Sequence, residues 1–302
     1  MKFNGVLFFP VTPFTPAGAV DGDLLSAHVN SRLPFALGGV FPACGTGEFH
    51  ALSAVEVGTV VAATVDAVKG TVPVVSGAGG PLGHAIECAR LASEAGADAL
   101  LVLPPYLVNG TSDGLVRYIE TIAAASDLPV IVYHRGTAQY SAASITRLAA
   151  NPKVVGFKDG TGDVGVAQEI VRAVAATGRD DFQFFNGLLT AELSQGAYRG
   201  IGIPLYSSAT FAMLPEVAKA YYDSYLAGDE KTRLALIDGF YSPLVRLRDQ
   251  TPGFGVSLIK AALRLGGMPV GSVRPPLVDP TPSQLDQLER ILAAGAELVA
   301  TH

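Results

Sequence analysis

The sequence predicts an α/β fold in which eight parallel strands close into a (β/α)8 barrel, the TIM-barrel architecture, followed by about three further helices. Short apolar runs alternate eight times with longer amphipathic segments, without a hairpin signal between neighbouring runs. Each run is apolar throughout, as expected for strands buried on both faces. The length of 302 residues, 49% of them hydrophobic, suits one such barrel with additions. A doubly wound open sheet is the alternative, but eight regularly spaced units favour closure.

Apolar runs bounded by glycine, proline and polar turn residues identify the strands. The expected strands are Gly5–Pro10, Gly38–Ala43, Val72–Ser76, Ala97–Leu103, Pro129–Tyr133, Lys153–Lys158, Phe182–Phe185 and Gly200–Ile203. Helical spacing of apolar residues marks the segments between them, and Ser53 followed by Glu56 is a capping-box signature. The expected helices are Asp23–Leu37, Ser53–Val68, Gly83–Ala95, Ser112–Ala125, Ala142–Ala150, Val164–Thr177, Thr190–Tyr198 and Pro215–Leu226.

The remainder of the chain lacks strand signals. It predicts three helices, at about Lys231–Leu247, Gly255–Leu265 and Pro282–Ala300. We therefore expect a catalytic barrel over residues 1–228 and a helical extension over residues 229–302. The extension is too short for a second catalytic domain, so it should pack on the barrel or build a subunit contact.

Composition excludes several classes of partner. The net charge is −6 and no basic patch is present, so nucleic acid is not expected. No apolar stretch reaches the length of a membrane span, and Ala97–Val108 is broken by two prolines. The N-terminal residues lack the pattern of a signal peptide. Cys44 and Cys88 give neither a disulfide framework nor a metal-ligand spacing, so a reduced, cytoplasmic protein is expected.

The sequence also argues against a metal or an organic cofactor. None of the histidines forms a helical pair, and only His134 follows a strand. The glycine-rich segment Gly77–Leu82 has leucine where a dinucleotide-binding fingerprint needs its third glycine. We therefore expect no metal and no cofactor.

Lys158 ends the apolar strand Lys153–Lys158 and opens onto the glycine-rich loop Asp159–Asp163. An ammonium at the end of a buried strand is poorly solvated, which favours the neutral amine. A neutral amine is a nucleophile for carbonyl carbon. The alternative is a structural lysine whose charged end reaches water beyond its aliphatic stem.

The other predicted strand ends identify candidate partners, because barrel active sites lie at the carboxyl ends of the strands. Gly45, Thr46 and Gly47 offer backbone amides and a hydroxyl that can bind a carboxylate. Tyr133 ends the strand before that of Lys158, so a phenol able to shuttle protons should lie beside the amine. A plain turn and a core tyrosine are the alternatives. The polar strand-end residues also include Thr12, Tyr106, Asn186, Ser207 and Ser208.

Four segments together resemble the dihydrodipicolinate synthase / N-acetylneuraminate lyase family of (β/α)8 enzymes. They are Pro10–Phe14, Gly45–Glu48, Val132–Tyr133 and Gly156–Asp159. The resemblance covers essentially the whole chain. It implies that Lys158 forms an imine with a 2-oxo acid, that Tyr133 relays protons, and that the Gly45–Gly47 loop holds the carboxylate of the 2-oxo acid. It also implies a homo-oligomer, a tetramer or a dimer, to which the loop Pro104–Tyr106 could contribute.

Two positions depart from dihydrodipicolinate synthase itself. Gly45 stands where that synthase has the first of two threonines, so one hydroxyl of the relay that also uses a tyrosine at the position of Tyr106 is missing. Ala138 stands where it has an arginine for its aldehyde substrate, whereas Arg135 could serve a differently placed carboxylate.

Within the family the sequence most resembles the 5-dehydro-4-deoxyglucarate dehydratases. The segments concerned are Gly45–Phe49, Ala78–Pro81, Val132–Gly136, Gly156–Asp163, Tyr206–Ala209 and Val273–Leu277. This resemblance implies a small sugar-acid substrate that is dehydrated and decarboxylated to 2,5-dioxopentanoate. Asn186, Ser207 and Ser208 are polar residues suited to such a hydroxylated diacid. The alternatives are an aldolase of the same family that releases pyruvate, and a non-catalytic sugar-acid-binding protein.

Overall fold

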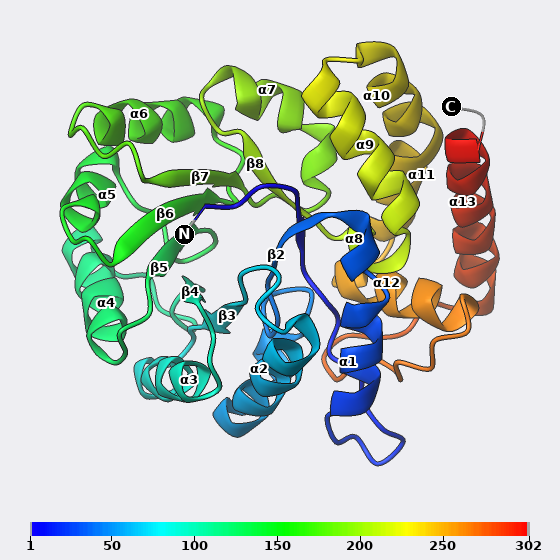
Figure 1. Cartoon of the computed structure of the whole chain (residues 1–302), viewed down its shortest axis with the longest axis horizontal. Helices are drawn as coiled ribbons and strands as arrows, with labels where there is room; N and C mark the ends of the chain where they lie inside the picture. The colour runs from blue at the N-terminus through cyan, green and yellow to red at the C-terminus, as the bar shows by residue number, and fades with distance from the viewer. Residues whose placement is uncertain (1, 301–302) are drawn as a thin grey trace.

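The computed structural model of the chain describes residues 2–300 and contains a ring of eight parallel strands surrounded by helices (Figure 1). The strands are β1 (Val6–Phe8), β2 (Leu37–Val40), β3 (Val75–Ala78), β4 (Ala99–Val102), β5 (Val130–His134), β6 (Val154–Asp159), β7 (Gln183–Asn186) and β8 (Leu205–Ser208). Their order is β2-β1-β8-β7-β6-β5-β4-β3, and a parallel bridge between Val40 and Val74 brings β2 to the β3 edge. The predicted (β/α)8 barrel is confirmed.

The outer helices follow the strands in turn. They are α1 (Gly22–Asn30), α2 (Ala54–Val68), α3 (Leu82–Glu94), α4 (Ser112–Ala124), α5 (Ala142–Ala149), α6 (Val164–Ala175), α7 (Gln195–Gly200) and α9 (Pro215–Ala227). Shorter helical segments are η1 (Leu33–Phe35), η2 (Phe49–Ala51), η3 (Ala191–Leu193) and α8 (Thr210–Met213). Ser53 accepts a hydrogen bond from the Glu56 amide while Glu56 accepts one from the Ser53 amide, so the predicted capping box begins α2.

The C-terminal helices gather on one side of the barrel, outside α8 and α9 (Figure 1). They are α10 (Glu230–Leu236), α11 (Ser242–Arg248), α12 (Phe254–Leu265) and α13 (Pro282–Ala300). A π-helical turn, η4 (Ile237–Tyr241), joins α10 to α11, so the first of the three predicted helices is continuous but wider in the middle. Among the helices of residues 2–300, none is long and apolar enough to cross a membrane.

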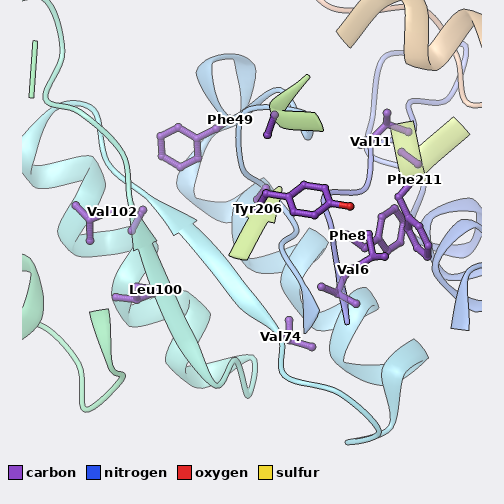
Figure 2. Close-up of a cluster of buried hydrophobic side chains, with 14 of the residues drawn as sticks. Val6, Phe8, Val11, Phe49, Val74, Leu100, Val102, Tyr206 and Phe211 are labelled. Atoms are coloured by element: carbon purple, nitrogen blue, oxygen red, sulfur yellow. The ribbon is translucent and has the colours of Figure 1, made fainter. Parts of the chain in front are cut away.

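Side chains alternate between the two faces of each strand and so build two cores. Val6 and Phe8 point outward into the cluster between strands and helices, where Phe8 meets Phe211 with ring centroids 5.4 Å apart (Figure 2). Leu7 and Phe9 point inward and fill the barrel. Burying one such aromatic side chain contributes about 2–3 kcal/mol. The inner core closes the barrel below the carboxyl ends of the strands.

The eighth strand differs from the prediction. The sequence analysis places it at Gly200–Ile203, whereas β8 is Leu205–Ser208. Gly200 is the last residue of α7, and Gly202 has a φ of 92°, which is incompatible with a strand. Ile203 packs beside Tyr198 in a small cluster outside the barrel. Its apolar character therefore reflects helix packing.

Candidate active site

The register between β5 and β6 places Tyr133 directly opposite Lys158. Phe157 belongs to the outer core, so strand alternation directs Lys158 into the barrel. The lysine is 5% exposed. The amine and the phenol thus lie together at the carboxyl end of the barrel.

The Lys158 amine is enclosed by aromatic and apolar groups. Its Nζ lies 4.2 Å from the ring centre of Phe9 and 4.5 Å from that of Tyr133. Burial lowers the pKa of Lys158 from 10.5 to about 7, and the Arg135 cation acts in the same direction. Both ring contacts favour the charged amine, so desolvation outweighs them. The neutral amine is therefore well populated near neutral pH.

Cys44 is a further titratable group inside the barrel that influences Lys158. A thiolate there would raise the pKa of Lys158. Burial, however, raises the pKa of Cys44 to about 12, so Cys44 is a neutral thiol at neutral pH. Its opposing influence on Lys158 is therefore absent under physiological conditions.

Two glycines allow the amine and the phenol to pack closely. A Cβ atom on Gly187 would lie 2.7 Å from both Cγ and Cε of Lys158. A Cβ atom on Gly160 would lie 2.7 Å from Cε2 of Tyr133. Side chains at either position would displace a central residue of the site.

The Tyr133 phenol has two polar partners. It donates a hydrogen bond to the Gly187 carbonyl at 2.8 Å and accepts one from Arg135 Nη1 at 2.9 Å. Burial raises the pKa of Tyr133, and the adjacent guanidinium opposes but does not cancel that effect. The phenol is therefore protonated at neutral pH and is oriented as a donor.

Asp159 organises the glycine-rich loop that follows Lys158. Its carboxylate accepts hydrogen bonds from the Thr161 amide at 3.1 Å, the Thr161 hydroxyl at 2.8 Å and the Gly162 amide at 3.3 Å. The Tyr198 hydroxyl also donates to it. The turn is therefore fixed by a buried charge and does not depend on glycine flexibility alone.

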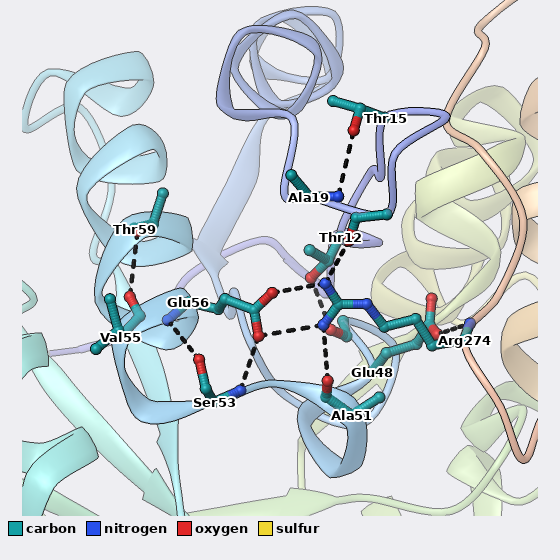
Figure 3. A network of polar contacts seen from close by, with 12 residues as sticks. Thr12, Thr15, Ala19, Glu48, Ala51, Ser53, Val55, Glu56, Thr59 and Arg274 are labelled. Atoms are coloured by element: carbon teal, nitrogen blue, oxygen red, sulfur yellow. Dashed lines mark hydrogen bonds and ion pairs between the residues drawn. The ribbon is translucent and has the colours of Figure 1, made fainter.

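The loop between β2 and α2 is held by an ion pair from the C-terminal helices. Glu48 is buried with a φ of 58°, and its Oε1 lies 2.6 Å from Nζ of Lys260 on α12. Its Oε2 accepts a hydrogen bond from the Arg274 amide at 2.8 Å (Figure 3). The Arg274 guanidinium donates to the Ala51 carbonyl at 2.8 Å and to Glu56 at 2.6 Å. The loop that carries Thr46 is thus anchored to residues more than 200 positions later.

A cavity of about 900 Å³ opens above the amine. Its lining brings together predicted site residues from several strands and loops, namely Gly45, Thr46, Tyr133, Arg135, Lys158 and Ser207. The cavity is lined mainly by apolar side chains with a few convergent polar groups, as is typical of small-molecule sites.

Asn186 and Ser208 lie outside that lining. Both face outward, because their strand neighbours Phe185 and Ser207 face inward. The Asn186 amide donates to Ser194 Oγ at 2.9 Å, and the Ser208 hydroxyl donates to buried Glu192 at 2.6 Å. Both side chains therefore support the barrel wall.

Gly47 and Tyr106 also lie outside the lining. The Gly47 carbonyl accepts a hydrogen bond from the Thr12 hydroxyl at 2.6 Å, which supports the loop from below. The Tyr106 side chain is 67% exposed. Tyr106 is therefore a surface residue in the single chain.

Several lining residues were not predicted from the sequence. They come mainly from the stretch that runs from the end of α11 to the start of α12 and include Arg248, Asp249, Thr251 and Phe254. This segment lacks strand signals, so a search of predicted strand ends passes over it. The other unpredicted polar lining residues are His50, Thr137 and Thr190. Within residues 2–300, no group of three His, Cys, Asp or Glu side chains is placed to hold a metal ion.

Fold and site together define a (β/α)8 lyase whose cavity is lined by a reactive amine. The model of the dihydrodipicolinate synthetase family matches residues 2–295, and the chain belongs to this family.

Named relatives and solved structures agree with that membership. A 5-dehydro-4-deoxyglucarate dehydratase of Pseudomonas putida is 37% identical over 96% of this chain and 94% of its own length. A Streptomyces avermitilis protein named "Probable 5-dehydro-4-deoxyglucarate dehydratase 1" is 47% identical over 98% and 95%. The dihydrodipicolinate synthase structure from Oceanobacillus iheyensis has a TM-score of 0.89 at 26% identity, covering 98% of this chain and 97% of that one.

Proposed function

We propose that this protein converts 5-dehydro-4-deoxy-D-glucarate to 2,5-dioxopentanoate, CO2 and water through an imine on Lys158. The observation that carries the proposal is the buried amine with a pKa lowered to about 7, beside a protonated phenol and below an open cavity. Relatives at up to 48% identity over nearly the whole chain that are named 5-dehydro-4-deoxyglucarate dehydratases support this choice of substrate.

The first step uses the neutral amine. Lys158 attacks the ketone carbon, the ketone oxygen leaves as water, and an iminium forms. Gly45 and Thr46, which line the cavity, bind the adjacent carboxylate through their amides and the Thr46 hydroxyl. Tyr133 lies next to the reacting carbon and moves the protons that carbinolamine formation and collapse require.

Dehydration and decarboxylation follow from the iminium. Its positive charge acidifies the neighbouring methylene, and loss of a proton gives an enamine. The enamine expels the next hydroxyl as water and leaves a conjugated iminium. The bond to the distal carboxylate then breaks, CO2 departs, and the electron pair returns to nitrogen. Protonation, tautomerisation and hydrolysis release the dioxo acid and regenerate the free lysine.

The proposal is tested by identifying the products of incubation with 5-dehydro-4-deoxy-D-glucarate. We expect equimolar CO2 and 2,5-dioxopentanoate, and borohydride trapping should add the substrate-derived mass to the Lys158 peptide. Lys158→Ala should abolish both, whereas Lys231→Ala, at an exposed helix position, should leave both unchanged. Normal turnover by Lys158→Ala would refute the mechanism.

The second candidate is an aldolase that releases pyruvate. It is favoured by the structural similarity to YagE, an Escherichia coli K12 prophage protein solved in complex with pyruvate. That structure has a TM-score of 0.85 at 25% identity and covers 98% of this chain and 99% of its own. A pyruvate-coupled assay separates the two reactions, because the dehydratase releases CO2 instead.

We further propose a homo-oligomer, a tetramer or a dimer, built partly by the loop after β4. Tyr106, Leu107 and Val108 are three consecutive apolar residues exposed to 67%, 77% and 65%. Such a patch marks an interaction surface more often than a solvated loop. Light scattering should give a mass above that of one chain, and a monomer would contradict the proposal.

We also propose a cellular location and a division of the chain into two parts. A cytoplasmic location suits Cys44 and Cys88, which are both free and buried. We also propose residues 1–228 as the catalytic barrel and residues 229–302 as an extension that packs on it. Fractionation of the producing cell would test the first. For the second, we expect residues 1–228 expressed alone to be less stable than the whole chain, because buried Glu48 would lose its partner Lys260.

A further inference from the structure

The cavity is lined by a cation that the proposed mechanism does not use. Arg248, the last residue of α11, lines the cavity wall together with Thr190 from the loop after β7. The strongly basic side chains of the lining are Lys158, Arg135 and Arg248. Lys158 reacts, and Arg135 is bonded to the Tyr133 phenol beside it. Arg248 is the cation that remains for a second anionic group of a ligand.

Arg248 is held in a fixed orientation. Its Nη1 donates a hydrogen bond to the Thr190 hydroxyl at 2.8 Å, and its Nε pairs with Asp249 at 2.8 Å. Its Nη2 has no hydrogen-bond partner among residues 2–300. Asp249 is largely exposed, so solvent screens its charge and weakens the pairing. One edge of the guanidinium therefore stays available to a carboxylate.

Thr190 adopts a backbone conformation that its residue type disfavours. Its φ and ψ are 53° and 62°, in the left-handed region. A β-branched residue is a true outlier there, and such strain persists where the surrounding structure imposes it, often at ligand sites. The strained backbone places the Thr190 hydroxyl against Arg248.

The same loop connects Arg248 to the reactive lysine. The Gly187 carbonyl bonds to Tyr133 at one end of the loop, and the Thr190 hydroxyl bonds to Arg248 at the other. These positions are three residues apart, so their Cα atoms are separated by at most about 11 Å. The two carboxyl carbons of an extended six-carbon diacid lie about 6 Å apart, given standard bond lengths. With side chains reaching inward, one substrate can contact both ends.

We propose that Arg248, oriented by Thr190, binds the distal carboxylate of a six-carbon 2-oxo diacid whose ketone lies at Lys158. This assignment rests on the proposed function for the identity of the substrate. It makes Arg248 a specificity-determining residue that selects diacids over 2-oxo acids with an uncharged end. The distal carboxylate loses its charge as CO2 leaves, so the arginine contributes to substrate binding and does not accelerate the chemical step.

The test compares two ligands that differ only at the distal end, 2-oxoadipate and 2-oxohexanoate. Isothermal titration calorimetry registers their binding whether or not an imine forms, so it stands apart from product identification. The variants are Arg248→Gln, which keeps a donor for Thr190, and Arg248→Lys, which keeps the charge. Arg246→Gln is the control, because Arg246 lies two residues earlier on the exposed face of α11.

The wild-type protein should bind 2-oxoadipate about tenfold to hundredfold more tightly than 2-oxohexanoate, the range for hydrogen bonds to a charged partner. Arg248→Gln should reduce that ratio to below about threefold, Arg248→Lys should restore part of it, and Arg246→Gln should preserve it. With the sugar acid, Arg248→Gln should raise KM about tenfold or more while kcat changes less than about threefold. An unchanged ratio in Arg248→Gln, the absence of a wild-type preference, or loss of the preference in Arg135→Gln alone would overturn the assignment. Failure of the proposed function would appear separately, as absence of the dioxo product.

Discussion

Replacing Lys158 with methionine should stabilise the fold at neutral pH and remove part of its pH dependence. Burial lowers the pKa of Lys158 from 10.5 to about 7 in the folded protein, whereas the unfolded chain keeps the ordinary value. Between these two pH values the unfolded state binds more protons than the folded state. The contribution of Lys158 to the free energy of unfolding therefore rises with pH between about pH 7 and pH 10.5.

The size of the effect follows from the shift. A change from 10.5 to about 7 lowers the free energy of unfolding by about 5 kcal/mol below pH 7, where Lys158 is charged in the folded protein as well. About 2 kcal/mol of that cost is relieved between pH 7 and pH 9. Lys158→Met keeps a similar volume and has no charge to desolvate, so it should be more stable at pH 7 by several kcal/mol.

Urea denaturation of the wild type and of Lys158→Met at pH 7 and pH 9 measures this directly. The stability difference between the two proteins should shrink by about 2 kcal/mol as the pH rises, because only the wild type gains from deprotonation. Lys231→Met, at an exposed position of α10, is the control and should track the wild type. A constant stability difference between the wild type and Lys158→Met over this pH range would refute a lowered pKa for Lys158.

Three further predictions concern the site. The rate of borohydride trapping with pyruvate should rise with pH around a midpoint of about 7, because the amine loses its proton there; a midpoint above 9 would contradict the burial argument. Tyr133→Phe should still bind pyruvate in calorimetry but turn over about 10²–10⁴-fold more slowly, and wild-type kcat would exclude a proton-relay role. Gly187→Ala, whose new Cβ would lie 2.7 Å from Lys158, should retain its circular dichroism but lose at least about tenfold in trapping rate.

The central pair of the site could be predicted because barrel geometry leaves little freedom. Tyr133 and Lys158 lie at the ends of consecutive parallel strands. Their side chains are therefore neighbours if both strands end at the same height in the barrel. The register between β5 and β6 places them opposite one another. The prediction that Tyr133 and Lys158 are neighbours does not require the exact strand boundaries.

Side-chain direction could not be predicted for polar residues that share a strand end. Ser207 and Ser208 have the same chemistry, yet only Ser207 lines the cavity, while Ser208 bonds to Glu192 behind the wall. Which of two neighbours faces inward depends on the strand register, and the predicted position of β8 was wrong. The short apolar run Ile201–Ile203 has a strand-like composition, but its residues serve the packing of α7.

Arg248 escaped prediction for a different reason. It reaches the cavity from the end of α11, in the C-terminal extension that follows the predicted eighth helix Pro215–Leu226. Its placement depends on how α11 docks against the barrel. Tertiary docking of a helix leaves no periodic signal that identifies a single residue as a ligand contact.

The buried ion pair between Glu48 and Lys260 makes the stability of the barrel depend on its C-terminal helices. Removing α12 would leave the Glu48 carboxylate without its cation inside the protein, at a cost of about 3–5 kcal/mol. The loss would fall on the loop that carries Thr46, so the damage would reach ligand recognition before the strands themselves came apart. A minimal barrel cut from this protein would need an uncharged residue in place of Glu48. An exchange of the C-terminal helices between relatives should give a stable protein only when the residues at positions 48 and 260 are exchanged together.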